Sequence, residues 1–274
     1  RHFMASIGCD FDYPAPVSSS VVGSAAYAGY RVENILICPE ENVYITANMY
    51  IPDGVCQKRG AVLFVCGHAV EGKHYKEYIK VCRYLVSAGL VVLAIDPTGQ
   101  GERLNFYDAV KKEKLIPPCT ADHDHAGLRG LMLGRNIAYY FLRDAMCAVS
   151  YLISRPEADP EKIGVTGNSG GGTQTSMVML ADRRIAAAAP GTFIMNNAEM
   201  LRSGQAQDAE QVWNSMFSDG IDHEDILISI APKPALVLAA EYDFFPKEGT
   251  DETVLRARRI WDICGAGDNL EYYT

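Results

Sequence analysis

The sequence lacks the features that would place it in a membrane or on a polyanion. No apolar run reaches the ~18 residues that a membrane-spanning helix requires. There is no block of lysine and arginine, and the formal net charge is −9. This acidic balance disfavours nucleic acid and anionic membranes as partners, so we expect neither, and a neutral or cationic substrate is electrostatically easier.

Regular cysteine spacing is also missing, because the eight cysteines are scattered and form no C-x-x-C pair. Cys66, Cys82 and Cys147 lie in apolar segments, where a free thiol behaves as a small hydrophobe. We therefore expect reduced, buried cysteines, with no disulfide framework or zinc site. Such usage slightly favours the cytoplasm. However, the chain begins at Arg1 without an initiator methionine, so we expect that preceding residues were removed and that secretion is not excluded.

Hydrophobic residues make up 48% of the 274 residues, which is typical of a globular domain. Residues 1–29 contain Pro14, Pro16 and a triple-serine run, and we expect an irregular arm there, laid over a domain of residues 30–274. Residues 31–38 and 43–51 are separated by a polar turn and predict an antiparallel hairpin.

Strand-like and helix-like segments then alternate along the chain. The predicted strands are 61–66, 90–95, 163–166, 185–189, 235–240 and 270–274. The predicted helices are 75–87, 131–154, one that begins after Ser169, 226–230 and 253–264. Loops are expected from 96 to 128 and in the region that ends at about 221. This alternation predicts an α/β fold with a mostly parallel sheet and helices on both faces. Ligands of such sheets bind beyond the carboxyl ends of the strands.

The segment IGVTGNSGGG, residues 163–172, contains G-x-S-x-G between a strand and a helix. This context is the one that a nucleophile elbow requires, so we expect Ser169 to be a nucleophile held at a strained turn. The N–H of Gly170 would then supply an oxyanion donor at the head of the helix. The alternatives are a phosphate-binding loop or plain tight packing, but no lysine stands at the P-loop position.

The elbow and its lead-in SRPEADPEKIGV, residues 154–165, resemble the α/β-hydrolase superfamily. Within that superfamily the chain is most similar to the group of acetyl xylan esterases, dienelactone hydrolases and prolyl oligopeptidases, from about residue 30 to the end. The resemblance implies an α/β-hydrolase fold and a Ser-His-Asp acyl-enzyme mechanism. This chemistry needs no cofactor, and we expect no metal.

The resemblance also implies roles for two loops. Gly67-His68-Ala69 stands where the esterases have an H-G-x turn, so the backbone N–H of His68, or that of Ala69, would be the second oxyanion donor. Cys66 stands where that pattern usually has histidine, so the sequence does not decide which backbone N–H is the second oxyanion donor. The segment DPTGQGER, residues 96–103, is similar to a family loop beside the cleft. We expect a mainly structural turn there, with Gln100 and Arg103 as candidate pocket residues.

The acid and the base of the triad follow the nucleophile in this fold. Asp243 comes shortly after the strand 235–240 and is the expected acid, with Glu241 as the alternative. No histidine follows Asp243. We therefore expect a chain cut short of its natural C-terminus, with the last strand at 270–274 and the base beyond Thr274, so that this segment alone would be weak or inactive. His223 is the alternative base, although it more readily belongs to a helix capped by Asp222.

Two further features are open between a functional and a structural role. Residues 122–125, DHDH, lie in an expected loop and would line the cleft, with His125 as a pocket candidate, or order the loop. A metal site is the less favoured alternative, because consecutive side chains seldom converge on one ion. Trp213 is expected either to wall the pocket or to pack in the core.

The expected function is therefore hydrolysis of carboxylic esters, with a small molecule or an acylated carbohydrate as substrate. The alternatives are a serine peptidase of the prolyl oligopeptidase type and a non-catalytic binding protein that kept the fold. The sequence fixes neither the acyl group nor the oligomeric state.

Overall fold

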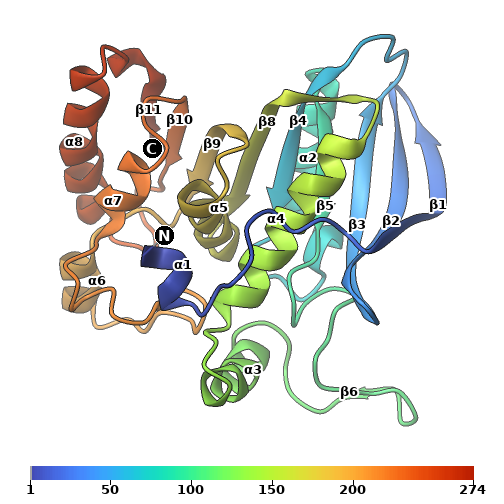
Figure 1. Cartoon of the computed structure of the whole chain (residues 1–274), viewed down its shortest axis with the longest axis horizontal. Coiled ribbons are helices and arrows are strands. Elements are labelled where there is room, and N and C mark those ends of the chain that lie inside the picture. The colour runs from blue at the N-terminus through green and yellow to red at the C-terminus, as the bar shows by residue number, and fades with distance from the viewer. Residues whose placement is uncertain (1) are drawn as a thin grey trace.

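A nine-stranded sheet forms the centre of the computed structural model, which describes residues 2–274 (Figure 1). The strands follow the order β1-β2-β3-β5-β4-β8-β9-β10-β11. They are β1 Ser18–Tyr27, β2 Tyr30–Glu40, β3 Val43–Pro52, β4 Arg59–Val65, β5 Val91–Ile95, β8 Ala158–Asn168, β9 Ile185–Gly191, β10 Ala235–Leu238 and β11 Leu270–Tyr273. A separate small hairpin joins β6 Tyr107–Asp108 to β7 Glu113–Lys114.

The sheet is mostly parallel, as the alternating pattern predicts. The ladders from β1 to β5 are antiparallel, and those from β5 through β4, β8, β9 and β10 to β11 are parallel. Residues 91–95 are buried on both faces, which explains their unbroken apolar run. The predicted hairpin is confirmed as β2 and β3. All parallel strands end at one edge, so the loops that follow them meet there.

Helices cover both faces of this sheet. They are α1 His2–Ser6, α2 Lys76–Ser87, α3 Thr120–Met132, α4 Ala138–Ser154, α5 Gly170–Ala181, α6 Asn197–Ser203, α7 His223–Ile228 and α8 Lys247–Ile263, with short 3₁₀ turns at Gly72–His74 and Gly267–Asn269. On one face, Cys82 and Val86 of α2 pack with Phe64 of β4. On the other, α4 and α5 pack in the larger core, and α4 crosses the sheet in Figure 1.

Within residues 2–29 the structure differs from the irregular arm that is expected for residues 1–29. Residues 18–27 form the edge strand β1, which pairs antiparallel with β2 from Ser18 opposite Cys38 to Tyr27 opposite Tyr30. Almost all of its side chains are exposed, so the segment carries no buried, alternating face that sequence patterning could detect. Backbone hydrogen bonds to β2 position this strand.

The segment between β5 and α4 also differs from the prediction of a loop followed by a long helix from residue 131. Residues 120–132 form α3, so the DHDH motif lies on a helix and not in a loop. The chain breaks at Gly134, whose φ is +75°, and α4 begins only at Ala138. A left-handed residue ends a helix, and Gly127 and Gly130 weaken the helical pattern of α3.

Among residues 2–274, every helix is too short or too polar to cross a bilayer. The eight cysteines are free thiols, and four of them are buried.

Candidate active site

Ser169 stands at a sharp bend between β8 and α5. Its backbone has φ 59° and ψ −119°, a conformation that a residue with a side chain rarely adopts. The Ser169 N–H donates hydrogen bonds to the carbonyl oxygen of Gly191 at 2.9 Å and to Oγ1 of Thr192 at 3.0 Å. These contacts from the end of β9 hold the strained turn in place. The predicted strand, bend and helix are therefore present at this position.

Close backbone packing explains the glycines around Ser169. A Cβ at Gly167 or at Gly171 would lie 2.2 Å from the carbonyl oxygen of Val65, which is far inside contact distance. The end of β4, the bend and the first turn of α5 therefore touch through their backbones. The first N–H groups of α5 have no intrahelical acceptor and point toward the bend, where the oxyanion hole is expected from the sequence.

The turn after β4 carries the second expected oxyanion donor. The Ala69 N–H donates to the carbonyl oxygen of Gly67 at 2.9 Å, so the backbone N–H of His68 is the better candidate of the two. Gln100 is buried, and its Nε2 donates to the carbonyl oxygens of Gly67 at 2.8 Å and Ala69 at 3.0 Å. Gln100 thus fixes the turn that bears His68. Its predicted place in a substrate pocket stays a prediction.

Arg103 makes contacts that tie loops together. Its Nε donates to the carbonyl oxygen of Tyr44 at 2.8 Å, and one terminal nitrogen donates to that of Asp96 at 3.0 Å. The other terminal nitrogen lies 2.6 Å from a carboxylate oxygen of buried Asp144. The guanidinium is therefore occupied by structural partners, and its role as a pocket residue also stays a prediction.

Asp243 lies in the loop after β10, two strands from Ser169 along the same carboxyl edge. It is half-buried, and its carboxylate accepts a hydrogen bond from the Phe245 N–H at 3.4 Å. Both Asp243 and Glu241 border a hollow of 530 Å³, in which Glu241 is exposed. The partial burial suits the residue that must hold an imidazole, while the acid role itself remains predicted.

His223 opens α7, behind an Asp222 N-cap that forms a full capping box with Asp225. Its ring is buried, lies 4.8 Å from that of Phe193, and its Nδ1 accepts a hydrogen bond from the Met195 N–H at 3.4 Å. Burial lowers the pKa of His223 to about 3. An imidazole so weakly basic, and so enclosed, is a poor proton acceptor for a serine.

The same burial makes His223 a source of acid sensitivity. Its pKa is about 3 in the folded chain and 6.5 ordinarily, so only the unfolded state binds this proton between those values. The contribution of His223 to the free energy of unfolding is then fully present above pH 6.5 and is lost as the pH falls. From this group alone, the free energy of unfolding should drop by about 2 kcal/mol between pH 7 and pH 5. Urea unfolding at a series of pH values should show this slope, and His223→Asn, whose amide oxygen can still accept from Met195, should reduce it.

The matched control is His125→Asn, which removes an exposed histidine from α3. This variant should keep the wild-type slope. An equal slope in the wild type and in His223→Asn would show that His223 is accessible to protons in the folded chain.

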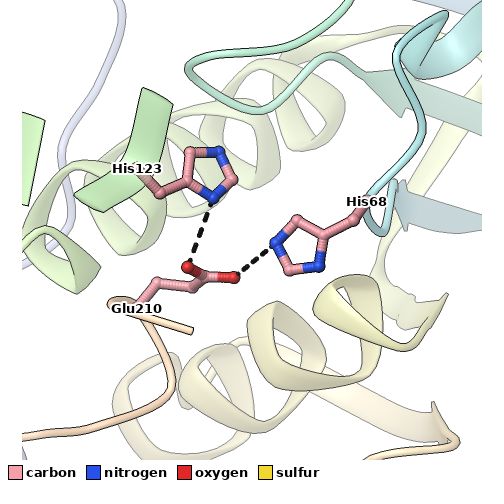
Figure 2. A group of neighbouring side chains, drawn as sticks. All are labelled: His68, His123 and Glu210. Carbon is pink, nitrogen blue, oxygen red and sulfur yellow. Dashed lines mark ion pairs between the residues drawn. The ribbon is translucent and has the colours of Figure 1, made fainter. Parts of the chain in front are cut away.

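A buried carboxylate joins two histidines beside the elbow (Figure 2). Oε1 of Glu210 lies 2.7 Å from Nε2 of His68, and Oε2 lies 3.3 Å from Nδ1 of His123. Oδ2 of Asp208 lies 3.3 Å from the other ring nitrogen of His68. A Cβ at Gly170 would stand 2.8 Å from Cε1 of His68, so this imidazole lies directly over the first turn of α5.

The charges in this group act on one another strongly. Burial lowers the pKa of His68, but the carboxylates of Glu210 and Asp208 outweigh it and leave the pKa raised. Burial alone would raise the pKa of Glu210, yet His123 and His68 hold it well below its usual range. Burial raises the pKa of Asp208. A fully buried carboxylate is stable only with such compensation.

The two remaining pocket candidates, His125 and Trp213, lie outside the group around Glu210. His125 is on the exposed side of α3, with its ring 6.0 Å from that of Phe106. Trp213 is buried in the larger core, where its ring lies 4.5 Å from that of Phe3, and its Nε1 donates to the carbonyl oxygen of Glu210 at 3.0 Å. Trp213 therefore packs in the core, and it also borders a cavity of 350 Å³ beside Phe3.

Sequence reasoning missed the group around Glu210. The sequence pattern places His123 only in the DHDH motif and gives Asp208 and Glu210 no role. These residues come from three segments that are far apart in the chain: the turn after β4, the helix α3 and the loop after α6. No local pattern links them.

Comparison with known proteins agrees with this geometry. A sequence model of the prolyl oligopeptidase family matches residues 133–224, which include the elbow. The Bacillus subtilis (strain 168) protein YtaP, named as a hydrolase, is 26% identical over 203 residues, which are 73% of this chain and 62% of that protein. The chain thus spans less than two thirds of the length of YtaP.

Solved structures share the fold over nearly the whole chain. A Bacteroides fragilis NCTC 9343 protein described as an acetyl xylan esterase has a TM-score of 0.77 at 17% identity, over 99% of this chain and 72% of that one. The glucuronoyl esterase from Solibacter usitatus has a TM-score of 0.71 at 12% identity, over 99% of this chain and 85% of that one. The sheet order, the strained serine at the strand–helix bend and these matches together show an α/β-hydrolase fold, and they are consistent with a member of the α/β-hydrolase superfamily.

Proposed function

We propose that this protein hydrolyses carboxylic esters through Ser169. The observation that carries the proposal is the strained bend that holds Ser169 at the head of α5, at the carboxyl edge of the sheet. A side chain held at φ 59° between a strand and a helix stands clear of both elements. Strain of this kind concentrates at functional sites.

In the proposed reaction the Ser169 hydroxyl attacks the ester carbonyl and expels the alcohol. The backbone N–H groups of Gly170 and His68 stabilise the oxyanion. A histidine takes the serine proton, and Asp243 orients that histidine. In this fold the base follows the nucleophile and the acid along the chain. Water then releases the acid from the acyl-enzyme.

The proposed substrates are small or carbohydrate esters. Support comes from structural neighbours that are named as an acetyl xylan esterase and a glucuronoyl esterase. The net charge of −9 also favours a neutral acylated sugar over a polyanion.

A serine peptidase is the second candidate, because the family model that matches residues 133–224 is that of the prolyl oligopeptidases. The same acyl-enzyme chemistry cleaves amides, so the elbow is compatible with both. The two activities differ in the substrate that the cleft accepts.

Labelling of the full-length protein with a fluorophosphonate tests the nucleophile. The probe should attach to one residue, and peptide mapping should find it on Ser169. Parallel assays with an acetyl ester and a proline-containing amide should show faster hydrolysis of the ester. The exposed serine Ser218 serves as an internal control and should stay unlabelled.

Labelling at another residue would overturn the assignment of Ser169. Faster cleavage of the amide would favour the peptidase, and an unlabelled, inactive full-length protein would favour a non-catalytic role.

A further inference from the structure

Three potential ligand atoms converge in the interior beside the elbow. Nε2 of His68, Nδ1 of His123 and a carboxylate oxygen of Glu210 all lie within 4.8 Å of one another (Figure 2). The side chains of His123 and Glu210 are completely buried, and that of His68 is 16% exposed. Ligands around a tetrahedral ion with bonds of ~2.1 Å stand about 3.4 Å apart. The distance from Nδ1 of His123 to Oε2 of Glu210 is close to this, at 3.3 Å, and that from Nε2 of His68 to Oε1 of Glu210 is shorter, at 2.7 Å.

These atoms have no other partner. Within residues 2–274, four buried side-chain atoms of this group make no hydrogen bond. They are both carboxylate oxygens of Glu210, Nε2 of His68 and Nδ1 of His123. The two ring nitrogens lie 2.7 Å and 3.3 Å from the carboxylate oxygens as ion pairs, without a hydrogen bond. Buried polar atoms almost always have a partner, so four such atoms facing one another point to an occupant between them.

The outer nitrogens of both rings are already held. Nε2 of His123 lies 3.0 Å from the carbonyl oxygen of Thr98, which can only accept, so this nitrogen carries the proton. In a neutral ring the lone pair is then on Nδ1, which faces Glu210. Oδ2 of Asp208 lies 3.3 Å from the outer nitrogen of His68, in an ion-pair contact. Metal-bound histidines typically donate their second N–H to a carbonyl or a carboxylate, as both of these rings can.

We propose that His68, His123 and Glu210 bind a divalent transition metal ion, with zinc as the best fit. Two imidazoles and one carboxylate form a ligand set that zinc accepts. Magnesium and calcium prefer oxygen ligands alone, and the two imidazoles disfavour them. Asp208 and the Thr98 carbonyl orient the two rings. The expectation from sequence alone was that the protein has no metal site.

The proposed ion would connect three segments next to Ser169. His68 belongs to the turn after β4, His123 to α3 and Glu210 to the loop after α6. A shared ion fixes all three, and with them the backbone of His68, which we proposed as an oxyanion donor. This site does not depend on the ester hydrolase function, because the ligand geometry is independent of Ser169.

The test measures binding directly with zinc chloride as the probe. The full-length protein is stripped with a chelator, titrated with zinc by calorimetry, and dialysed before its metal content is measured. We expect about one zinc ion per chain and a melting temperature that rises with zinc and falls again with EDTA. The cobalt-substituted protein should show the strong visible bands of a four-coordinate site.

Variants then assign the ligands. Asp208→Asn should weaken zinc binding by about 10- to 100-fold, because it removes only the partner of His68. Glu210→Gln and His123→Gln should weaken it by at least as much. The matched control is His125→Gln, which removes an exposed histidine two residues from His123 on the same helix and should bind zinc as the wild type does.

The wild-type titration decides the proposal even where a variant fails to fold. A folded, stripped wild-type protein that takes up no zinc and keeps its melting temperature would overturn it. In that case His68 is held only by ion pairs to Glu210 and Asp208. If both Glu210→Gln and His123→Gln bound zinc as tightly as the wild type, the assignment of these residues as ligands would also be overturned.

Discussion

Ser169→Ala is expected to reduce kcat for hydrolysis of an acetyl ester by about 10⁴-fold or more, because no other hydroxyl can form the acyl-enzyme. The oxyanion donors remain in this variant and leave a residual rate above that of water. Alanine at the strained bend is no larger than serine, so the fold should be kept. Steady-state kinetics of the full-length protein, together with circular dichroism, check the result.

Ser176→Ala is the matched control for this variant. Ser176 is buried in the same helix, and its hydroxyl donates only to the carbonyl oxygen of Gly172 at 2.9 Å. Its loss should leave kcat within a few-fold of the wild type. Retention of more than a tenth of the activity in Ser169→Ala would contradict the proposed mechanism.

Lys73→Met is expected to lower the free energy of unfolding by about 3–5 kcal/mol, because it leaves a buried carboxylate without its cation. The Lys73 Nζ lies 2.6 Å from Oδ2 of Asp96, and the two side chains are 1% and 0% exposed. The Asp96 carboxylate also accepts hydrogen bonds from the Lys73 N–H at 2.7 Å and from Oγ1 of Thr46 at 2.7 Å. Urea denaturation measures the change.

Two further variants test the cause of that loss. Lys80→Met removes an exposed lysine that lies 3.2 Å from Glu77, and its effect should stay within about 1 kcal/mol. The double variant Lys73→Met with Asp96→Asn removes both charges and should be more stable than Lys73→Met alone. A double variant no more stable than the single one would show that packing, and not the unpaired charge, is responsible.

Much of the fold could be predicted from the sequence because its signals are local. The unbroken apolar run 91–95 is typical of a strand buried on both faces, and it forms β5. The segment 163–172 carries its own strand, turn and helix signals, so the position of Ser169 followed directly. Asp222 is an N-cap by residue type, and the structure has it there.

The two elements that were not predicted from the sequence, β1 and α3, lack such local signals. Strand β1 is nearly all exposed and depends on hydrogen bonds to β2, which a window of sequence does not contain. Helix α3 has glycines and charges that weaken its amphipathic pattern, so the sequence predicts a loop up to residue 128 and places the next helix at 131–154.

The sequence by itself indicated the α/β-hydrolase resemblance, the nucleophile candidate and the succession along the chain of the parallel strands whose loops form the site. Only the tertiary structure decided which polar side chains meet. His68, His123 and Glu210 are separated by more than fifty residues at each step along the chain, and their encounter depends on how α3 and the loop after α6 pack over the turn after β4. Residue type and spacing describe neighbours along the chain, whereas buried charges are compensated by neighbours in space.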